Sequence, residues 1–284
     1  MSGEALLLVL SASAIHAGWN LLAKRSGKRL IFLWLGLAAG LIIWSPVAFW
    51  IMLLDPPPWR GFLFILASGS VHFCYYQAVA RMYAYDFSVT YPTARGISPV
   101  FTTILALALL REPLTFGGIV GIAVVVAGVG TLQLAGAKTC WRALIAEGAF
   151  RTAATTGALI AAYSVIDKVG VALVHPISYL WLSHLVALVL LAPVMWNHRQ
   201  GILPEIRDAG IRLGVVGLGQ NLAYILVLFA MRMVPVAYVV PTRELSTVFA
   251  VLLGSRILGE SHIKQRLAGA FLIVAGIGLI AWQG

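Results

Sequence analysis

The sequence predicts an all-α membrane protein with ten transmembrane helices, organised as two inverted five-helix repeats. Three observations lead to this prediction. Of the 284 residues, 61% are hydrophobic and only 11% are charged, whereas a soluble domain carries about 25% charged residues. Apolar stretches recur along the whole chain, each long enough to cross a hydrocarbon core of about 30 Å. Finally, the segment around Arg95 recurs around Arg243.

The apolar stretches define the expected spans, and the connections between them are too short for a soluble domain. The first stretch lacks the positively charged leader of a cleavable signal peptide, so we expect it to be retained. The two cysteines, Cys74 and Cys140, indicate neither a disulfide framework nor a metal site. The expected spans are residues 4–23, 30–53, 61–80, 87–110, 115–134, 152–173, 177–196, 211–231, 236–258 and 266–283.

The formal net charge of +10 is explained by membrane topology. Most lysines and arginines lie beside the odd-numbered connections, and loops rich in these residues stay in the cytoplasm. This distribution predicts that both termini lie outside. It also removes the reason to expect nucleic acid as a partner, and leaves a small-molecule substrate and the lipid bilayer.

The two halves of the chain align at an offset of 148 residues, which predicts repeats at 1–137 and 145–284. Five spans are an odd number, so the second repeat must enter the membrane in the opposite sense. Inverted repeats are typical of secondary transporters, whose substrate sites lie near the bilayer midplane at the repeat interface. The aligned pairs are Arg95 with Arg243, Ser98 with Ser246, Glu112 with Glu260, "AGVG" at 127–130 with "AGIG" at 275–278 and, across one gap, Pro92-Thr93 with Pro241-Thr242.

The two aligned arginines are the most informative polar residues. An ionised arginine at the centre of a span costs about 2.5–3.5 kcal/mol. Arg95 and Arg243 each closely follow a proline, Pro92 or Pro241, and these prolines are candidate hinges because they lack an amide donor. The arginines are expected either to hold a substrate carboxylate or phosphate, or to reach the interface or brace a neighbouring helix.

Glu244 has no counterpart in the first repeat, where Gly96 stands. It is a candidate for a coupling proton, but we favour an ion pair with an arginine on a neighbouring helix. Arg243 itself is a poor partner, because adjacent residues of one helix do not face each other. Asp167 and Lys168 fall late in their span. Asp167 could contact the ammonium of an amino acid, but because of this position we expect both residues to be interfacial charges.

A further set of polar and aromatic residues is placed to line a substrate cavity. His16 and Asn20 are four residues apart and share a helix face, where they would bind substrate or join helices by hydrogen bonds. Because a histidine side chain ordinarily titrates near neutrality, His16 is also a candidate proton site. A largely apolar cavity with a few polar groups suits a small organic ligand. The remaining candidates are Tyr75, Tyr76, Tyr91, Tyr163, Gln220, Tyr224 and Tyr238.

The glycines predict close helix packing. "GGIVG" at 117–121 and the two AGxG segments give the fifth and tenth spans small faces, which allow helix backbones to approach closely. These two helices either pack against each other or face a neighbouring molecule. We expect them to pack within one molecule, and the protein to function as a monomer.

Together these motifs resemble the drug/metabolite transporter superfamily, in particular its ten-span EamA type. The resemblance rests on "AIHAGWN" at 14–20, the paired Pro-Thr segments and the repeated glutamate-to-AGxG pattern. It covers nearly the whole chain, and it implies a central cavity between the two inverted repeats, without an ATPase domain. The aromatic amino-acid exporters are the nearest analogy. One departure is that the only acid of the first span is Glu4, so the proton exchange of the small multidrug branch does not carry over.

The sequence contains no motif of an intramembrane hydrolase or of an ATP-binding loop. We therefore predict a multi-pass secondary transporter of the cytoplasmic (inner) membrane that exports small amino-acid-like metabolites, with no catalytic residue, metal or cofactor. A broad-specificity drug or metabolite exporter is the alternative. An intramembrane enzyme is disfavoured.

Overall fold

The computed structural model describes residues 1–23, 29–82, 85, 87–134, 148–249 and 263–283. Within these ranges all regular structure is helical, as predicted. The elements are α1 (Gly3–Ala23), α2 (Arg29–Leu54), α3 (Trp59–Met82), α4 (Phe87–Leu105) with the π-helical turn η1 (Ala106–Leu110), α5 (Phe116–Leu134), α7 (Ala149–Leu173), α8 (Pro176–Trp196), α9 (Arg199–Ala209), α10 (Ile211–Met233), α11 (Val236–Thr242) and α13 (Ile263–Gln283).

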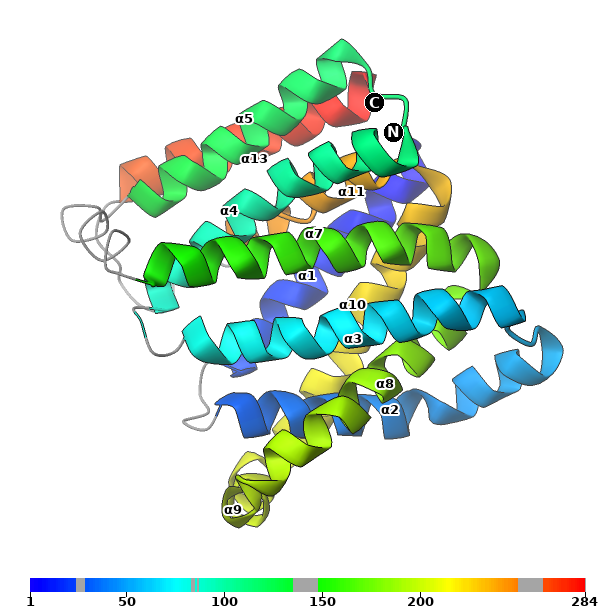
Figure 1. Cartoon of the computed structure of the whole chain (residues 1–284). Helices are drawn as coiled ribbons and strands as arrows, with labels where there is room; N and C mark the ends of the chain where they lie inside the picture. The colour runs from blue at the N-terminus through cyan, green and yellow to red at the C-terminus, as the bar shows by residue number, and fades with distance from the viewer. Residues whose placement is uncertain (24–28, 83–84, 86, 135–147, 250–262, 284) are drawn as a thin grey trace.

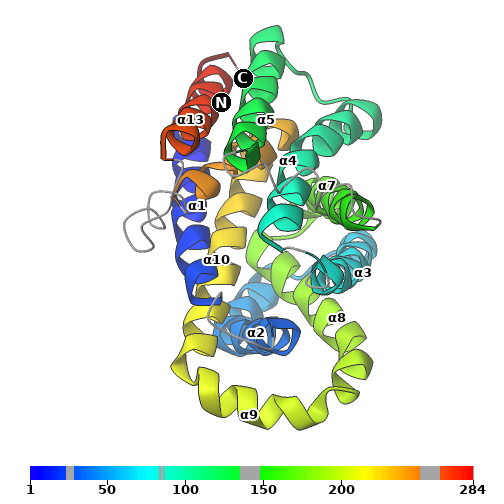
Figure 2. The ribbon, with the colours of Figure 1, turned by 90° about the vertical axis from the view of Figure 1, so that its left-hand side faces the viewer.

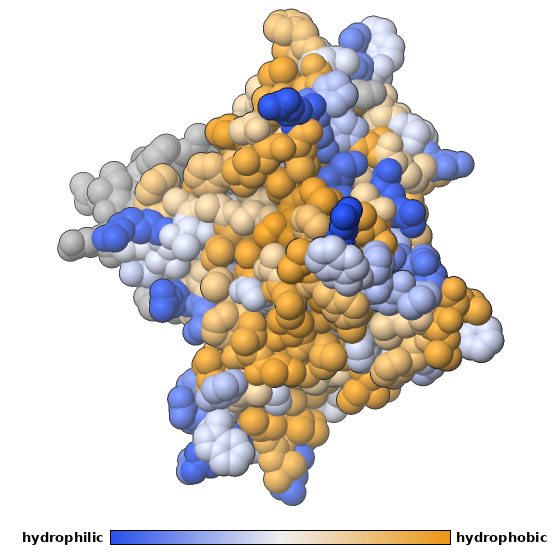
Figure 3. All heavy atoms as spheres, turned by 45° about the vertical axis from the view of Figure 1, so that its right-hand side comes forward, coloured by the Kyte–Doolittle hydropathy of each residue, from blue (hydrophilic) through white to orange (hydrophobic). Residues whose placement is uncertain are grey.

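Six stretches in the described helices are long and apolar enough to cross a membrane by length and composition, and α5 and α13 contribute shorter apolar stretches. Apolar side chains cover most of the middle of the face in Figure 3, as expected for helices that contact lipid. The count of ten spans remains a prediction, since the expected span at 236–258 runs beyond the described residues. The short helix α9, between α8 and α10, was not predicted.

Helices α5 and α13 lie side by side along one edge of the molecule (Figures 1 and 2). Their glycines meet: a Cβ at Gly121 would lie 2.8 Å from the carbonyl oxygen of Gly276, and one at Gly128 would lie 2.9 Å from that of Gly269. The prediction that the small faces pack within one molecule is therefore confirmed.

The other long helices form contacting pairs that carry side chains toward the centre. Helix α1 packs on α10, α4 packs on α7, and α3 packs on both α7 and α8, while α2 lies against α8 and α10. The short helix α11 touches α1, α4, α5, α7, α10 and α13, and all its residues are buried. The residues that follow α11 therefore lie where both halves of the chain meet.

The chain leaves regular helix directly after α11, at Arg243 and Glu244, and becomes helical again at 245–249. Pro241 has no amide to donate back along the helix, and the amides that follow bond over shorter separations. The amide of Glu244 donates to the carbonyl of Pro241 at 3.0 Å, and that of Ser246 donates to the carbonyl of Arg243 at 3.1 Å. The helix is therefore interrupted shortly after Pro241, one of the two candidate hinges. Helix α4, by contrast, continues through position 92.

Candidate functional site

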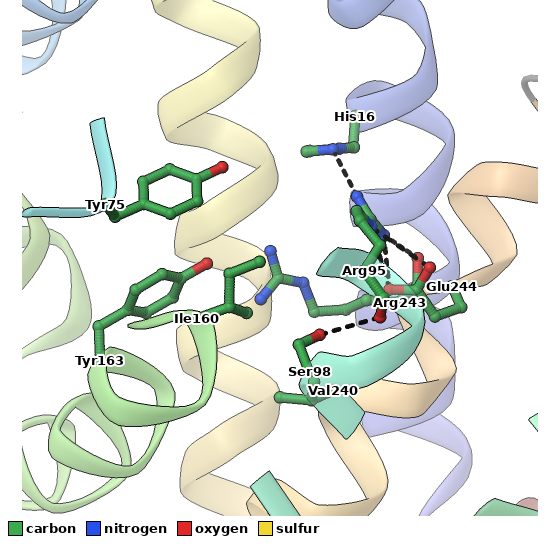
Figure 4. A pocket seen from close by; sticks show the side chains of 9 residues that line it. All are labelled: His16, Tyr75, Arg95, Ser98, Ile160, Tyr163, Val240, Arg243 and Glu244. Carbon is green, nitrogen blue, oxygen red and sulfur yellow. Dashed lines mark hydrogen bonds and ion pairs between the residues drawn. The ribbon is translucent and has the colours of Figure 1, made fainter. Parts of the chain in front are cut away.

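A small pocket lies beside this break (Figure 4). Six of its lining residues belong to the predicted set, and three more, Ser98, Ile160 and Val240, were not predicted. The pocket has a volume of about 30 Å³, which is room for a water molecule or two and far below the 300 Å³ or more of a typical metabolite site. The six predicted residues are His16, Tyr75, Arg95, Tyr163, Arg243 and Glu244.

The first of the two aligned arginines is paired with the unmatched glutamate. Nε of Arg95 lies 3.1 Å from Oε1 and 3.2 Å from Oε2 of Glu244, and its Nη2 lies 2.9 Å from Oε1. The side chains are 12% and 3% exposed, so the charges neutralise each other where water has little access. The predicted ion pair between Glu244 and an arginine of a neighbouring helix is confirmed, and it joins the two halves of the chain.

Arg95 also forms hydrogen bonds with His16 on α1 and with Ser246, which follows the helix break. Its Nη1 donates to Nε2 of His16 at 3.0 Å, and its Nη2 donates to Oγ of Ser246 at 3.0 Å. Since a guanidinium has no acceptor, the imidazole takes part in this bond with an unprotonated Nε2. Asn20 does not line the pocket: its side-chain amide donates to the carbonyl of His16 in its own helix, at 3.0 Å.

The second aligned arginine has a different environment. The Arg243 side chain extends across the pocket toward Tyr75 and Tyr163 (Figure 4), and its Cζ lies 5.2 Å from the centre of the Tyr224 ring. Among the described residues, no carboxylate lies within ion-pair distance of its guanidinium. Of the two arginines related by the repeat, one is therefore neutralised and the other presents its charge to the pocket.

Aromatic rings surround this charge. The centres of the Tyr75 and Tyr163 rings are 5.7 Å apart, and those of Tyr163 and Tyr224 are 5.9 Å apart. His72 stacks on Tyr163 at 4.3 Å and was missing from the predicted set, although it lies on the same helix as Tyr75. Rings with polar tips offer both apolar surface and hydrogen bonds.

Like Asn20, three further predicted residues lie away from the pocket. The hydroxyl of Tyr76 accepts a hydrogen bond from Gln220 at 2.8 Å, and neither residue lines the pocket. The hydroxyl of Tyr238 accepts from the amide of Thr115 at 2.9 Å, and its ring is buried among residues of α5 and α13. The side chains of Tyr91 and Pro92 are outside the described residues.

Asp167 does not lie where the sequence predicted. It was expected to be an interfacial charge at the end of its span, but it is fully buried. Its carboxylate accepts hydrogen bonds from the hydroxyls of Ser68 at 2.5 Å, Tyr179 at 2.8 Å and Tyr224 at 2.5 Å. One signal pointed to this burial: Asp167 lies four residues after Tyr163 and therefore on the same face of its helix.

The side chain of Lys168, the residue after Asp167, contacts α10 and Glu112 instead. Its ammonium donates to the carbonyls of Met231 and Val234 at the end of α10 and lies 4.0 Å from Oε1 of Glu112. The Glu112 carboxylate accepts from the amides of Val236 at 2.8 Å and Ala237 at 3.2 Å. It therefore caps the N-terminus of α11, where negative charge is favoured.

Comparisons with known proteins agree with this architecture. The model of the EamA-like transporter family matches residues 3–132 and again residues 151–282, one match in each half of the chain. A search among curated proteins found no match. Among solved structures, 27 chains match. One of them, titled "Crystal structure of protein", has a TM-score of 0.74 and 17% sequence identity, over 99% of this chain and 98% of that chain.

The two family matches cover most of the sequence and agree with the repeat that the aligned arginines indicate. At 17% sequence identity, the similarity to the solved structure supports the fold and no statement about function. Members of the family are membrane transporters rather than enzymes. The chain therefore belongs to the EamA-like transporter family of the drug/metabolite transporter superfamily, and it is a multi-pass membrane transporter.

Proposed function

We propose that the protein is a secondary transporter that exports small amino-acid-like metabolites, aromatic amino acids among them, across the cytoplasmic membrane by alternating access. The observation that carries the proposal is the Arg243 guanidinium, which faces the pocket without a carboxylate partner among the described residues. In this proposal Arg243 binds the substrate carboxylate, while Arg95 maintains the structure through Glu244.

The chemistry of the pocket supports a carboxylate bound next to an apolar or aromatic group. A guanidinium matches a carboxylate with two parallel hydrogen bonds, and such bonds gain strength where water is excluded. Ile160 and Val240 add aliphatic surface beside Tyr75 and Tyr163. An aromatic side chain placed there would pack on these rings edge to face or offset.

The volume of the pocket implies that substrate enters only after a rearrangement, since about 30 Å³ cannot hold an amino acid. The break after Pro241 is the proposed hinge, with Pro92 as its counterpart. The contacts of Arg95 with Glu244 and His16 tie α1 and α4 to the end of α11, so they would hold the closed state. Two inverted repeats, 1–137 and 145–284, would exchange conformations to open the site to alternate sides.

The alternative is a broad-specificity drug or metabolite exporter, with which the family match agrees equally well. The tyrosine rings favour it, because aromatic surface accepts planar apolar compounds whatever their charge. The two proposals differ in their dependence on Arg243. We further propose that the carrier acts as a monomer and has both termini outside the cell.

The test is uptake of a labelled amino-acid panel into proteoliposomes that contain only this protein. We expect Arg243→Gln to lower uptake of the preferred amino acid at least about tenfold, as the loss of one charge-assisted bond predicts. The matched control is Arg232→Gln, which changes an exposed arginine at the end of α10 and should transport like the wild type. Wild-type uptake by a folded Arg243→Gln variant would refute the carboxylate site, and uptake of apolar cations instead of amino acids would support the alternative.

A further inference from the structure

Asp167 is a buried carboxylate with an unusual set of partners. It is fully buried, and its three hydrogen-bond donors are neutral hydroxyls from three helices: Ser68 on α3, Tyr179 on α8 and Tyr224 on α10. Within the described part of the chain, no cation forms an ion pair with it. A buried carboxylate is stable when charged only if it is well hydrogen-bonded, and it otherwise takes a proton.

The hydroxyl shell suits either protonation state. When the carboxylate is ionised it accepts all three bonds, as the geometry shows. When it is protonated, its O–H can donate to a lone pair of Ser68 or of a tyrosine, because a hydroxyl both donates and accepts. A salt bridge would offer the carboxylate only donors, whereas each of these hydroxyls can also accept a hydrogen bond from a protonated carboxyl group.

Tyr224 connects this carboxylate to the pocket. Its hydroxyl donates to Oδ2 of Asp167 at 2.5 Å, while the Arg243 guanidinium lies 5.2 Å from the centre of its ring. One aromatic ring therefore separates the buried negative charge from the uncompensated positive charge. Because the two charged groups contact the same tyrosine side chain, protonation of Asp167 should change the affinity of Arg243 for an anion.

We propose that Asp167 is a proton-binding site of this transporter, and that its protonation is linked to binding of an anionic group at Arg243. The second half of the proposal rests on the proposed function, while the first half stands without it. The proton comes from solvent on one side of the membrane and returns to solvent, so no bond of the substrate changes.

The sign of the linkage follows from the charges. The positive charge of Arg243 favours the ionised form of Asp167. A substrate carboxylate on Arg243 cancels that charge, so anion and proton promote each other's binding. Two unit charges about 10 Å apart interact, at an effective dielectric of about 20, strongly enough for about a tenfold effect on affinity.

Other titratable groups near Asp167 also respond to pH and must be separated from it by variants. These groups are His72 on α3, Arg95 on α4, Lys168 and Tyr163 on α7 itself, Tyr179 and His184 on α8, Tyr224 on α10 and Arg243 after α11.

The experiment is infrared difference spectroscopy of the full-length protein in nanodiscs, between a neutral and an acidic buffer. We expect the wild type to gain a carbonyl stretching band of a neutral carboxylic acid as pH falls. Asp167→Asn should lack this band. Asp208→Asn, a change at an exposed aspartate of α9, should keep it.

3-Phenylpropionate, an anion that has no ammonium group, is then added at the pH where the band is half-developed. In the wild type the band should grow, and in Arg243→Gln it should stay constant. At neutral pH, Asp167→Asn should bind 3-phenylpropionate about tenfold more tightly than the wild type, because the variant has no negative charge at position 167. If Asp167→Asn does not fold, Tyr224→Phe replaces it: the band should change, because the carboxyl group loses one of its three hydroxyl partners.

The outcomes separate the two proposals. A spectrum unchanged by Asp167→Asn, or by Tyr224→Phe where that variant is used, overturns the proton site. A band that is unaffected by 3-phenylpropionate, although 3-phenylpropionate binds, overturns the linkage. A band that depends on Asp167 without 3-phenylpropionate binding at any pH supports the proton site and overturns Arg243 as a carboxylate site.

Discussion

The ion pair between Arg95 and Glu244 makes a quantitative prediction about stability. Glu244→Gln removes the negative charge but keeps the shape of the side chain. Three contacts join the carboxylate to the guanidinium, at 2.9, 3.1 and 3.2 Å. In the variant, a side-chain amide that donates hydrogen bonds replaces one of the accepting oxygens, so two donors face each other.

The size of the effect follows from burial. Removing one partner of a buried ion pair costs about 3–5 kcal/mol, because the other charge is left uncompensated. Arg95 is 12% exposed and keeps its bonds to His16 and Ser246, so we expect the lower end of this range. On the scale of domains of 150–250 residues, about 3 kcal/mol lowers the melting temperature by about 6–12 °C.

The assay is thermal unfolding of the purified protein in one detergent, followed by tryptophan fluorescence. The matched control is Asp208→Asn, which breaks the ion pair with Arg212 on the surface, where Asp208 is 73% exposed. Exposed pairs contribute little, so its melting temperature should hardly change. The double variant Arg95→Gln/Glu244→Gln should recover part of the loss, since neither charge remains unpaired. A Glu244→Gln protein that melts within a degree of the wild type would refute the structural role of this pair.

Three further predictions concern packing, pH and topology. Gly276→Ala should lower the free energy of unfolding by about 1–3 kcal/mol, because its Cβ would lie 2.7 Å from the carbonyl oxygen of Gly121. Gly278→Ala is the control: a Cβ there has no atom within 4 Å, so this variant should melt like the wild type in the same experiment. Burial lowers the pKa of His175, whose Nδ1 accepts a hydrogen bond from an amide in the first turn of α8. The unfolded chain therefore takes up the proton at a higher pH than the folded protein, so the free energy of unfolding should fall as the pH drops below about 6.5. The fall should be smaller in His175→Asn, which keeps a capping acceptor but does not titrate. Lys28→Cys, in a connection that is outside the described residues and is predicted to be cytoplasmic, should be protected from impermeant thiol reagents added to intact cells. Ready labelling of this cysteine would contradict the predicted orientation.

The sequence by itself determined the class of the protein, its repeat and its close helix packing. Hydropathy and residue spacing are local properties that survive in any packing arrangement, so the apolar spans were visible without coordinates. The glycine faces of α5 and α13 were visible for the same reason, because only small residues allow backbones to approach. Glu244 was also understood in outline: a carboxylate in a span needs a partner, and its helical neighbour could not be that partner.

Only the tertiary structure decided which polar groups meet. Arg95 and Arg243 are equivalent in the repeat, yet Glu244 pairs with Arg95 and leaves Arg243 to the pocket. Asp167 is fully buried, although its position in the span suggested the membrane interface. These outcomes depend on the rotation and crossing of each helix. Spans that are apolar on nearly all sides do not encode them locally, because burial against protein and exposure to lipid select the same residue types.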